Sequence, residues 1–333
     1  MQTQKLINDG NAAVDEMLTG ILAAHPNHLF RPEHTSRAVV ARNGPRPGKV
    51  ALVIGGGSGH EPTFLGYVGK GLADACAVGN VFASPPPQPA VDAALAANGG
   101  AGVLFMYGNY AGDVMNFDMA TELLEMEGVE ARTVVTTDDI ASSPNREKRR
   151  GVAGNVFIFK VAGAAADLML QLDEVERIAR HANFRTHTMG VALSSCSLPQ
   201  TRRPSFDLPV GEMEIGMGIH GEPGVRRGPL RPANEVADEI MGALLNEMNA
   251  ARGDRVAVLI NSLGATPLME LYILYARVAE RLAEAGLTVH KALVGPYCTS
   301  LDMAGASITL MHLDDELERL IDHPCDCAMF RQG

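Results

Sequence analysis

The sequence Lys49-Val50-Ala51-Leu52-Val53-Ile54, followed at once by Gly55-Gly56-Gly57-Ser58-Gly59-His60-Glu61-Pro62, decides the fold class. A short, continuous apolar run is typical of a parallel strand that is buried on both faces. Similar runs and intervening segments with helical character follow, the runs at 102–107 and 131–136 and the helical segments at 88–98 and 117–126. This alternation predicts a parallel sheet covered by helices, in which ligands bind beyond the carboxyl ends of the strands.

Elements of the same kinds fill the second half of the chain. We expect helices over 163–182 and 267–285, and strands at 188–193, 255–260, 288–294 and 307–310. A chain of 333 residues is longer than one compact core usually holds. We therefore predict an α/β protein of two domains, each with a mostly parallel or mixed sheet flanked by helices. Residues 1–185 form the first domain, which carries the glycine-rich segment, and residues 186–333 form the second.

The composition is that of an ordinary globular protein with an acidic surface. Hydrophobic residues make up 46% of the chain and the net charge is −11, which disfavours nucleic acid and anionic membranes as partners. No apolar run approaches the roughly 20 residues that cross a bilayer, and residues 1–6 lack the apolar core of a secretory signal. We therefore expect a cytoplasmic protein. The five cysteines are scattered without the spacing of a disulfide framework or metal site, so no metal is expected.

The glycine-rich segment 55–62 is the first candidate for a ligand site. Backbone amides of such a loop can hold an anion at a helix N-terminus. However, no Lys-Ser/Thr follows the glycines, and His60 stands where a dinucleotide-binding motif would have its third glycine. A tight strand-to-helix turn would explain the glycines, but it would not explain His60 and Glu61.

Two further segments place polar side chains near the same edge of the predicted sheet. Asp113, in Asn109-Tyr110-Ala111-Gly112-Asp113, follows the second strand and is either a helix N-cap or a general base facing the crevice of His60. Ser84 precedes three prolines that force a rigid, extended exit from another apolar stretch. Its hydroxyl either stabilises the turn or donates a hydrogen bond to a substrate.

The segment Gly216-Met217-Gly218-Ile219-His220-Gly221-Glu222-Pro223-Gly224 is a shaped loop that presents one imidazole. Such a density of glycine is unfavourable in helices and strands and allows a ligand close to the main chain. A neutral imidazole can act as a base, a metal ligand or a nucleophile. Since no other His, Cys or Asp lies close to His220 in sequence, a metal is the weakest of these three interpretations.

Six motifs, taken in order, resemble the substrate-binding subunit of the dihydroxyacetone kinase family. They are 55–62, 82–85, 109–113, 216–224, Asn261-Ser262-Leu263-Gly264-Ala265-Thr266-Pro267 and Thr299-Ser300-Leu301-Asp302-Met303-Ala304-Gly305, and they cover nearly the whole chain. The resemblance implies a homodimer of two-domain α/β subunits that binds a short ketose as a hemiaminal on His220. It also implies that Asp113 takes the proton of the phosphorylated hydroxyl and that His60 bonds the substrate and assists proton transfer. The residues implied to line the site are Gly57, Ser58, Gly59, Ser84 and Gly108.

The resemblance also implies that the nucleotide is bound elsewhere. In this family a helical, nucleotide-binding L-type subunit or a fused domain carries ATP or ADP with Mg²⁺. Since the chain ends at Gly333, we expect it to bind no cofactor itself and to need such a partner. The phosphoryl donor is either ATP or a phosphoprotein of the sugar phosphotransferase system.

Two departures from the family pattern bear on the substrate. Gly108 stands where bacterial dihydroxyacetone subunits usually have lysine, and Ala111 replaces threonine. A smaller site floor makes a tetrulose such as erythrulose an alternative to dihydroxyacetone. The competing functions are a ketose sensor that regulates a partner protein and a glycine-rich nucleotide-binding enzyme, the latter disfavoured by the missing P-loop lysine.

Overall fold

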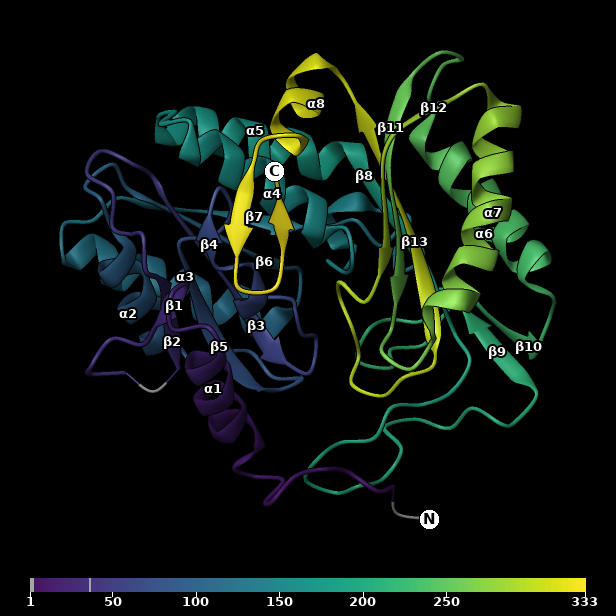
Figure 1. The fold of residues 1–333 in the computed structure, drawn as a ribbon, viewed down its shortest axis with the longest axis horizontal. Helices are drawn as coiled ribbons and strands as arrows, with labels where there is room; N and C mark the ends of the chain where they lie inside the picture. Colours follow the sequence, from purple (N-terminus) through teal and green to yellow (C-terminus); the bar gives the residue numbers. More distant parts are fainter. Residues whose placement is uncertain (1–2, 36) are drawn as a thin grey trace.

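A computed structural model describes residues 3–333 except residue 36; residues 1, 2 and 36 of the predicted first domain lie outside the described residues. In this part of the chain the first sheet has six strands (Figure 1). Their order is β1 (Leu29–Phe30), β2 (Ala38–Ala41), β5 (Ala75–Val81), β3 (Ala51–Ser58), β6 (Val103–Gly108) and β7 (Ala131–Thr136). Strands β5, β3, β6 and β7 are parallel, whereas β1 and β2 form an antiparallel edge.

The second sheet, in the same described residues, also has six strands. Their order is β10 (Arg226–Pro229), β9 (Glu212–Ile215), β8 (Thr186–Ala192), β13 (Gly305–Leu313), β11 (Arg255–Ser262) and β12 (Thr288–Gly295). The β11–β12 pair is parallel and the other described pairs are antiparallel, so the sheet is mixed. Helices α6 (Ala233–Met248) and α7 (Leu268–Ala285) cover its outer face (Figure 1).

Both faces of each sheet are buried, because alternate side chains along the strands enter different cores. Leu52 and Ile54 enter the central core, whereas Ala51 and Val53 pack beneath α2 (Pro87–Ala97) and α3 (Ala111–Met126). The central core also receives α1 (Ala13–Ala24), α4 (Asn155–Asp167), α5 (Leu172–Arg185), α8 (Asp315–Ile321) and the inner face of the second sheet. The two sheets therefore share one core, with helices between them and on both outer faces (Figure 1).

The end of the chain returns to the first half. Strand β14 (Cys325–Cys327) pairs with both β15 (Arg331–Gln332) and β4 (Gly69–Lys70). Strands β14 and β15 form the yellow hairpin at the front of Figure 1. Short 3-10 helices lie at Leu65–Tyr67 and Arg146–Lys148. The predicted α/β class, with one mostly parallel and one mixed sheet, is confirmed. The domain boundary between residues 185 and 186 stays a prediction; α5 ends and β8 begins there.

Two predicted elements have different bounds in the structure. The single helix predicted over 163–182 is wrong, because α4 ends at Asp167 and α5 begins at Leu172. Met169 lies between them with φ of 64°, a left-handed conformation that a right-handed helix cannot pass through. The strand predicted at 49–54 runs instead over Ala51–Ser58, so half of the glycine-rich segment is strand. Glycine is needed there because a Cβ on Gly56 would lie 2.3 Å from the Phe64 ring.

Candidate active site

The site forms where the carboxyl ends of β3 and β6 meet a loop of the second sheet. Strand β3 lies between β5 and β6, so the chain leaves β3 in one direction and later returns on its other side. Such a switch point leaves a crevice beyond the strand ends in which α/β proteins bind ligands. His60 follows β3, Asp113 lies in the first turn of α3 after β6, and the loop after β9 brings His220 to them.

His60 is fully enclosed and has a fixed tautomer. Its Nδ1 lies 2.7 Å from the Thr299 carbonyl oxygen, which can only accept, so Nδ1 carries the hydrogen. Its Nε2 faces Nε2 of His220 at 3.0 Å. Burial and, to a smaller extent, the charge of His220 lower the pKa of His60 to about 3. His60 is therefore a neutral imidazole whose free nitrogen points at the second histidine.

His220 is held by the carboxylate two residues after it. Its Nδ1 donates to Glu222 Oε1 at 2.9 Å, and its backbone amide donates to Glu222 Oε2 at 3.0 Å. Burial by itself would raise the pKa of Glu222, but the hydrogen bond and charge of His220 outweigh this and lower it to about 2. Because Glu222 accepts a hydrogen bond from Nδ1, Nε2 is the ring nitrogen of His220 that faces His60. The side chain of His220 is 23% exposed.

Aromatic rings enclose the histidine pair. Phe82 stacks on His60 with centroids 5.0 Å apart, and it meets His220 edge-on at 5.1 Å. Tyr110 also meets His220 edge-on, at 4.8 Å. The Tyr110 ring fills the space beside Gly108, where an added Cβ would lie 2.9 Å from Tyr110 Cε2 and 3.0 Å from the Gly151 carbonyl oxygen. The space that a lysine side chain would need at position 108 is therefore occupied, not open.

Asp113 is a buried carboxyl with an unused acceptor. Tyr110, not Asp113, is the N-cap residue of α3, so the N-cap interpretation of Asp113 is wrong. Among the described residues Asp113 Oδ1 has no hydrogen-bond partner, and the residue is 8% exposed. Burial raises the pKa of Asp113 to about 6, and the Ser84 hydroxyl and the charge of His220 restrain that rise. A carboxyl with these properties can accept a proton near neutral pH.

The remaining predicted site residues frame this group through their backbone and packing. The Ser58 hydroxyl donates to the Gly79 carbonyl oxygen at 2.8 Å, and Ser84 Oγ accepts from Asn116 Nδ2 at 3.1 Å. A Cβ on Gly57 would lie 2.7 Å from the Ala83 amide nitrogen. The Gly59 amide donates to both carboxylate oxygens of Glu61, at 3.1 Å each. Since Glu61 occupies that amide, the loop does not fit a phosphate cradle, and the nucleotide-site interpretation loses its support.

A turn of the second half, which sequence reasoning included only as part of a motif, fixes His60. Asn261, fully buried, accepts from the Tyr297 and Cys298 amides at 2.9 and 2.8 Å and donates to the Cys298 carbonyl oxygen at 2.7 Å. This orients the following Thr299 carbonyl toward His60. The contact spans 239 residues, so no local pattern reveals it. The sequence signal that could have pointed to this turn is Asn261, a polar residue at the end of an apolar strand.

Arg150 is a second residue that sequence reasoning missed. Its guanidinium donates to Asp139 at 2.9 Å and to the Gly216 carbonyl oxygen at 3.2 Å, and it lies 3.8 Å from Glu222. Arg150 thus ties the loop after β7 to the loop that carries His220. A Cβ on Gly218 would lie 2.2 Å from Glu222 Oε2 and 2.5 Å from the guanidinium, so this close approach requires glycine.

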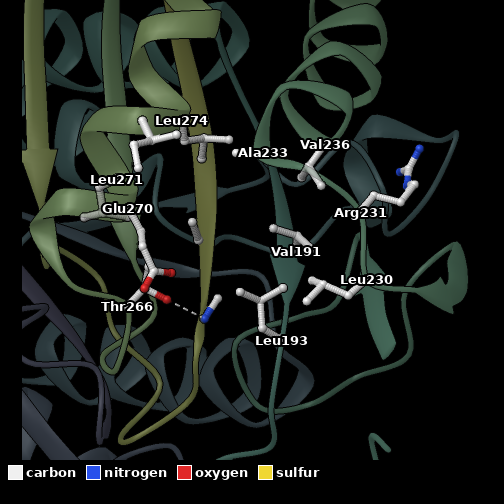
Figure 2. A pocket seen from close by; sticks show the side chains of 13 residues that line it. Val191, Leu193, Leu230, Arg231, Ala233, Val236, Thr266, Glu270, Leu271 and Leu274 are labelled. Atoms are coloured by element: carbon white, nitrogen blue, oxygen red, sulfur yellow. Dashed lines mark hydrogen bonds between the residues drawn. The ribbon is translucent and has the colours of Figure 1, made fainter. Parts of the chain in front are cut away.

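A separate cavity of about 250 Å³ lies between α6, α7 and the second sheet. Its lining is mostly apolar and includes Val191, Leu193, Leu271 and Leu274 (Figure 2). None of the histidines or Asp113 lines it.

Among the described residues no group of three or more His, Cys, Asp or Glu side chains could hold a metal ion. In the same part of the chain, no helix is long and apolar enough to cross a membrane.

The fold and the site together define a class of two-sheet α/β proteins with a histidine–carboxylate group between the sheets. The family model of the Dak1 domain matches residues 19–329, which is most of the chain. The dihydroxyacetone-binding subunit DhaK of the PTS-dependent dihydroxyacetone kinase 2 of Listeria innocua is 52% identical, covering 98% of this chain and 99% of that protein. The L-erythrulose kinase of Pectobacterium atrosepticum is 44% identical, but the chain spans only 56% of its length.

Solved structures agree with this assignment. The dihydroxyacetone kinase of C. freundii in complex with AMP-PNP and Mg²⁺ has a TM-score of 0.89 at 34% identity, over 99% of this chain and 61% of that one. The dihydroxyacetone kinase operon co-activator DhaQ has a TM-score of 0.89 at 33% identity, over 96% of this chain and 98% of that one. The chain belongs to the Dak1 domain family, and the predicted family resemblance is confirmed.

Proposed function

We propose that this chain is the ketose-binding, catalytic subunit of a dihydroxyacetone-type kinase and holds a short ketose as a hemiaminal on His220. The observation that carries the proposal is the 3.0 Å contact between the Nε2 atoms of His60 and His220, with Glu222 on the far nitrogen of His220. This arrangement leaves one nucleophilic nitrogen and one proton-transferring nitrogen side by side. A carbonyl carbon with its oxygen fits such a pair.

The chemistry follows from the positions of the hydrogens. The hydrogen between the two Nε2 atoms passes to Nε2 of His60, which frees the lone pair on Nε2 of His220. Nε2 of His220 then forms a bond to the ketone carbon, the carbonyl π-bond breaks, and the oxygen takes that proton from His60. The bound imidazole keeps its hydrogen on Nδ1 and becomes a cation beside the Glu222 carboxylate. Asp113 accepts the proton of the hydroxyl that is phosphorylated. Glycerol, which has no electrophilic carbon, cannot form the bond, so the covalent step selects ketoses.

The partner carries the other half of the reaction in this proposal. A helical L-type subunit, or an equivalent domain, supplies ATP or ADP with Mg²⁺, or passes on phosphate from a phosphoprotein of the phosphotransferase system. This chain's contribution is to fix and orient the acceptor hydroxyl, which is a large part of catalysis in phosphoryl transfer. The occupied Gly59 amide supports this division, because the glycine-rich loop does not fit phosphate.

The substrate is dihydroxyacetone or a tetrulose such as erythrulose. Relatives with both kinds of name match the chain over nearly its full length. The departure at Gly108 does not enlarge the site in the simple way that the missing lysine suggested, since Tyr110 fills that space. Substrate size is instead limited by the Tyr110 ring, which lies against His220.

We further propose that the chain forms a homodimer through the mouth of the cavity in Figure 2. Large apolar side chains are exposed on α7, namely Leu268, Met269, Tyr272 and Ile273, and Leu230 is exposed just before α6. Ile273 and Leu230 also line the cavity. Exposed apolar side chains gathered on one helix and around a cavity mouth are typical of an interface between subunits. The active site does not lie at this face, since neither histidine lines the cavity.

A ketose sensor that regulates a partner protein is the alternative function. The likeness to the co-activator DhaQ, at a TM-score of 0.89, favours it. The buried Asp113 with its unpartnered oxygen favours catalysis, because binding alone needs no proton acceptor. Both functions use the same histidine.

Two variants separate these functions. Intact-protein mass after incubation with dihydroxyacetone or either erythrulose enantiomer and reductive trapping should show one adduct, which His220→Ala removes. Asp113→Asn should keep the adduct and lose turnover with an added nucleotide-binding subunit and ATP. Full turnover in Asp113→Asn would remove the catalytic assignment, and an adduct without any turnover of the unaltered chain would favour the sensor.

A further inference from the structure

Helix α3 exposes an apolar face that the proposed active site does not use. Met115, Met119, Leu123 and Met126 are 60%, 49%, 37% and 83% exposed. At 3.6 residues per turn these four side chains fall within about 80° of arc, so they form one stripe along the helix. We call this stripe the methionine face. Three of its four members are methionine, an adaptable side chain that is over-used at binding surfaces.

The methionine face begins beside the proposed active site. Asp113 lies two residues before Met115, in the first turn of the same helix, and its side chain is buried in the site. Ser84 lies at the same helix end, bonded to Asn116 Nδ2. A protein that brings a phosphoryl group to a hydroxyl beside Asp113 must therefore contact the start of α3. From there a contact surface continues directly along the stripe.

The charged residues of α2 and α3 are all acidic. From Gly71 to Ala131 the sequence contains no lysine, arginine or histidine, and this stretch includes all of α2 and α3. Asp118, Glu122 and Glu125 are exposed on α3 beside the stripe. A second copy of this chain would bring acid against acid, so this face disfavours self-association. It fits a partner that has an apolar patch with a basic rim.

We propose that the methionine face of α3 is the docking surface for the nucleotide-carrying subunit, with apolar contacts along the stripe and basic groups of the partner against Asp118, Glu122 and Glu125. The inference rests on the proposed function, because that function requires a separate phosphoryl donor at Asp113. The α7 face remains available to a second copy of the chain. The two surfaces then assign different partners to opposite halves of the molecule, with α3 in the left half and α7 in the right half of Figure 1.

The test uses a double variant, Met119→Glu with Met126→Glu, neither residue being part of the site. Methionine and glutamate have similar helix propensities, so α3 is retained. A purified helical nucleotide-binding subunit of the dihydroxyacetone kinase type, loaded with ATP and Mg²⁺, is titrated against each protein. We expect the dissociation constant and the KM for this subunit to rise about tenfold or more, because two apolar contacts become buried charges. kcat at saturating partner should stay within about twofold.

Two further measurements complete the design. Val210→Glu, which adds one negative charge at a fully exposed residue outside α3, should leave partner binding unchanged. Glu122→Lys should weaken binding, and added salt should weaken binding of the unaltered chain. Partner affinity within about twofold of the unaltered chain in the double variant would overturn the proposal. So would a loss of dimer in place of a loss of partner binding, or a failure of the unaltered chain to bind the subunit.

The design also separates this inference from the proposed function. Partner binding is measured without ketose, and the His220 adduct is measured by mass without partner. Lost docking in the double variant with no ketose adduct in any protein would keep the docking surface and remove the covalent site. A normal adduct with unaltered docking in the double variant would keep the covalent site and remove the docking surface.

Discussion

Replacing Glu222 with glutamine tests how the His220 nitrogen is prepared for attack. Glu222 accepts two hydrogen bonds, one from Nδ1 of His220 at 2.9 Å and one from its backbone amide at 3.0 Å. Each of its two oxygens accepts one of these bonds. Glutamine has only one oxygen and offers an NH₂ group to the second donor, so one of the two N–H groups loses its partner.

The size of the effect follows from these two bonds. A charged acceptor contributes about 1.5–3 kcal/mol and a neutral one about 0.5–1.5 kcal/mol, so the retained bond weakens by about 1 kcal/mol. The unpaired N–H in this largely buried loop costs a further 1–3 kcal/mol or so. The cationic imidazole of the adduct needs the negative charge more than the free histidine does. The cost of an N–H group that is unpaired both with and without ketose cancels in the affinity. We therefore expect ketose affinity to fall by about 1–1.4 kcal/mol, which is roughly 5-fold to 10-fold.

The assay is the trapped adduct, quantified by intact-protein mass over a range of dihydroxyacetone concentrations. Glu212→Gln, a matched change at the start of β9 in the same half, should leave the midpoint unchanged. Circular dichroism and thermal unfolding confirm that both variants are folded. Adduct formation by Glu222→Gln within about threefold of the unaltered chain would refute the reasoning, because it would show that the carboxylate does not direct the His220 hydrogen.

Two pH predictions follow from the same group of residues. Because burial raises the pKa of Asp113 to about 6, kcat should rise with pH through about 6. The Ser84 hydroxyl lowers this pKa, so Ser84→Ala should move the rise in kcat to higher pH. A rise that moves to lower pH in this variant would contradict the assignment. Because burial lowers the pKa of His60 to about 3, this residue binds a proton in the unfolded chain but not in the folded chain between about pH 6.5 and pH 3, so its contribution to stability falls as pH drops. In urea unfolding between pH 6.5 and 4.5, His60→Gln should lessen that slope by about 1.4 kcal/mol per pH unit, since the variant lacks this proton, whereas equal slopes would show that His60 does not titrate in this way.

The fold class could be predicted because it depends on local patterns. The apolar runs at 102–107 and 131–136 became β6 and β7 with little change in their bounds. The helix at 163–182 failed because Met169, a residue with good helix propensity, turns left-handed between α4 and α5. Nothing in its immediate sequence indicates this. The surrounding core imposes it, since α4 is almost wholly buried and α5 packs on it.

The candidate site was predictable in its residues but not in its geometry. His60, Asp113 and His220 stood out because each follows a predicted strand or lies in a glycine-rich loop. Their mutual contacts depend on residues that are remote in sequence, such as the Thr299 carbonyl group behind His60. Arg150 and Tyr110 were missed because an arginine or tyrosine in a loop carries no signal of its own. Only the folded chain places Arg150 near Glu222 and Tyr110 against His220.

The glycine-rich segment shows how one sequence feature can serve two different purposes. In a phosphate site, glycines leave backbone amides free to point at the anion. Here Gly55 and Gly56 pair with β5 and Gly59 donates to Glu61, so these glycines serve close packing and the shape of the turn. In the proposed function the reactive groups are therefore side chains, one imidazole that binds the ketose and one carboxyl that accepts a proton. A site with these groups and with acid along α3 has little with which to neutralise a triphosphate. The positive charge that phosphoryl transfer requires must then come from the donor's side, which explains why the acceptor and the donor belong to separate surfaces in this proposal.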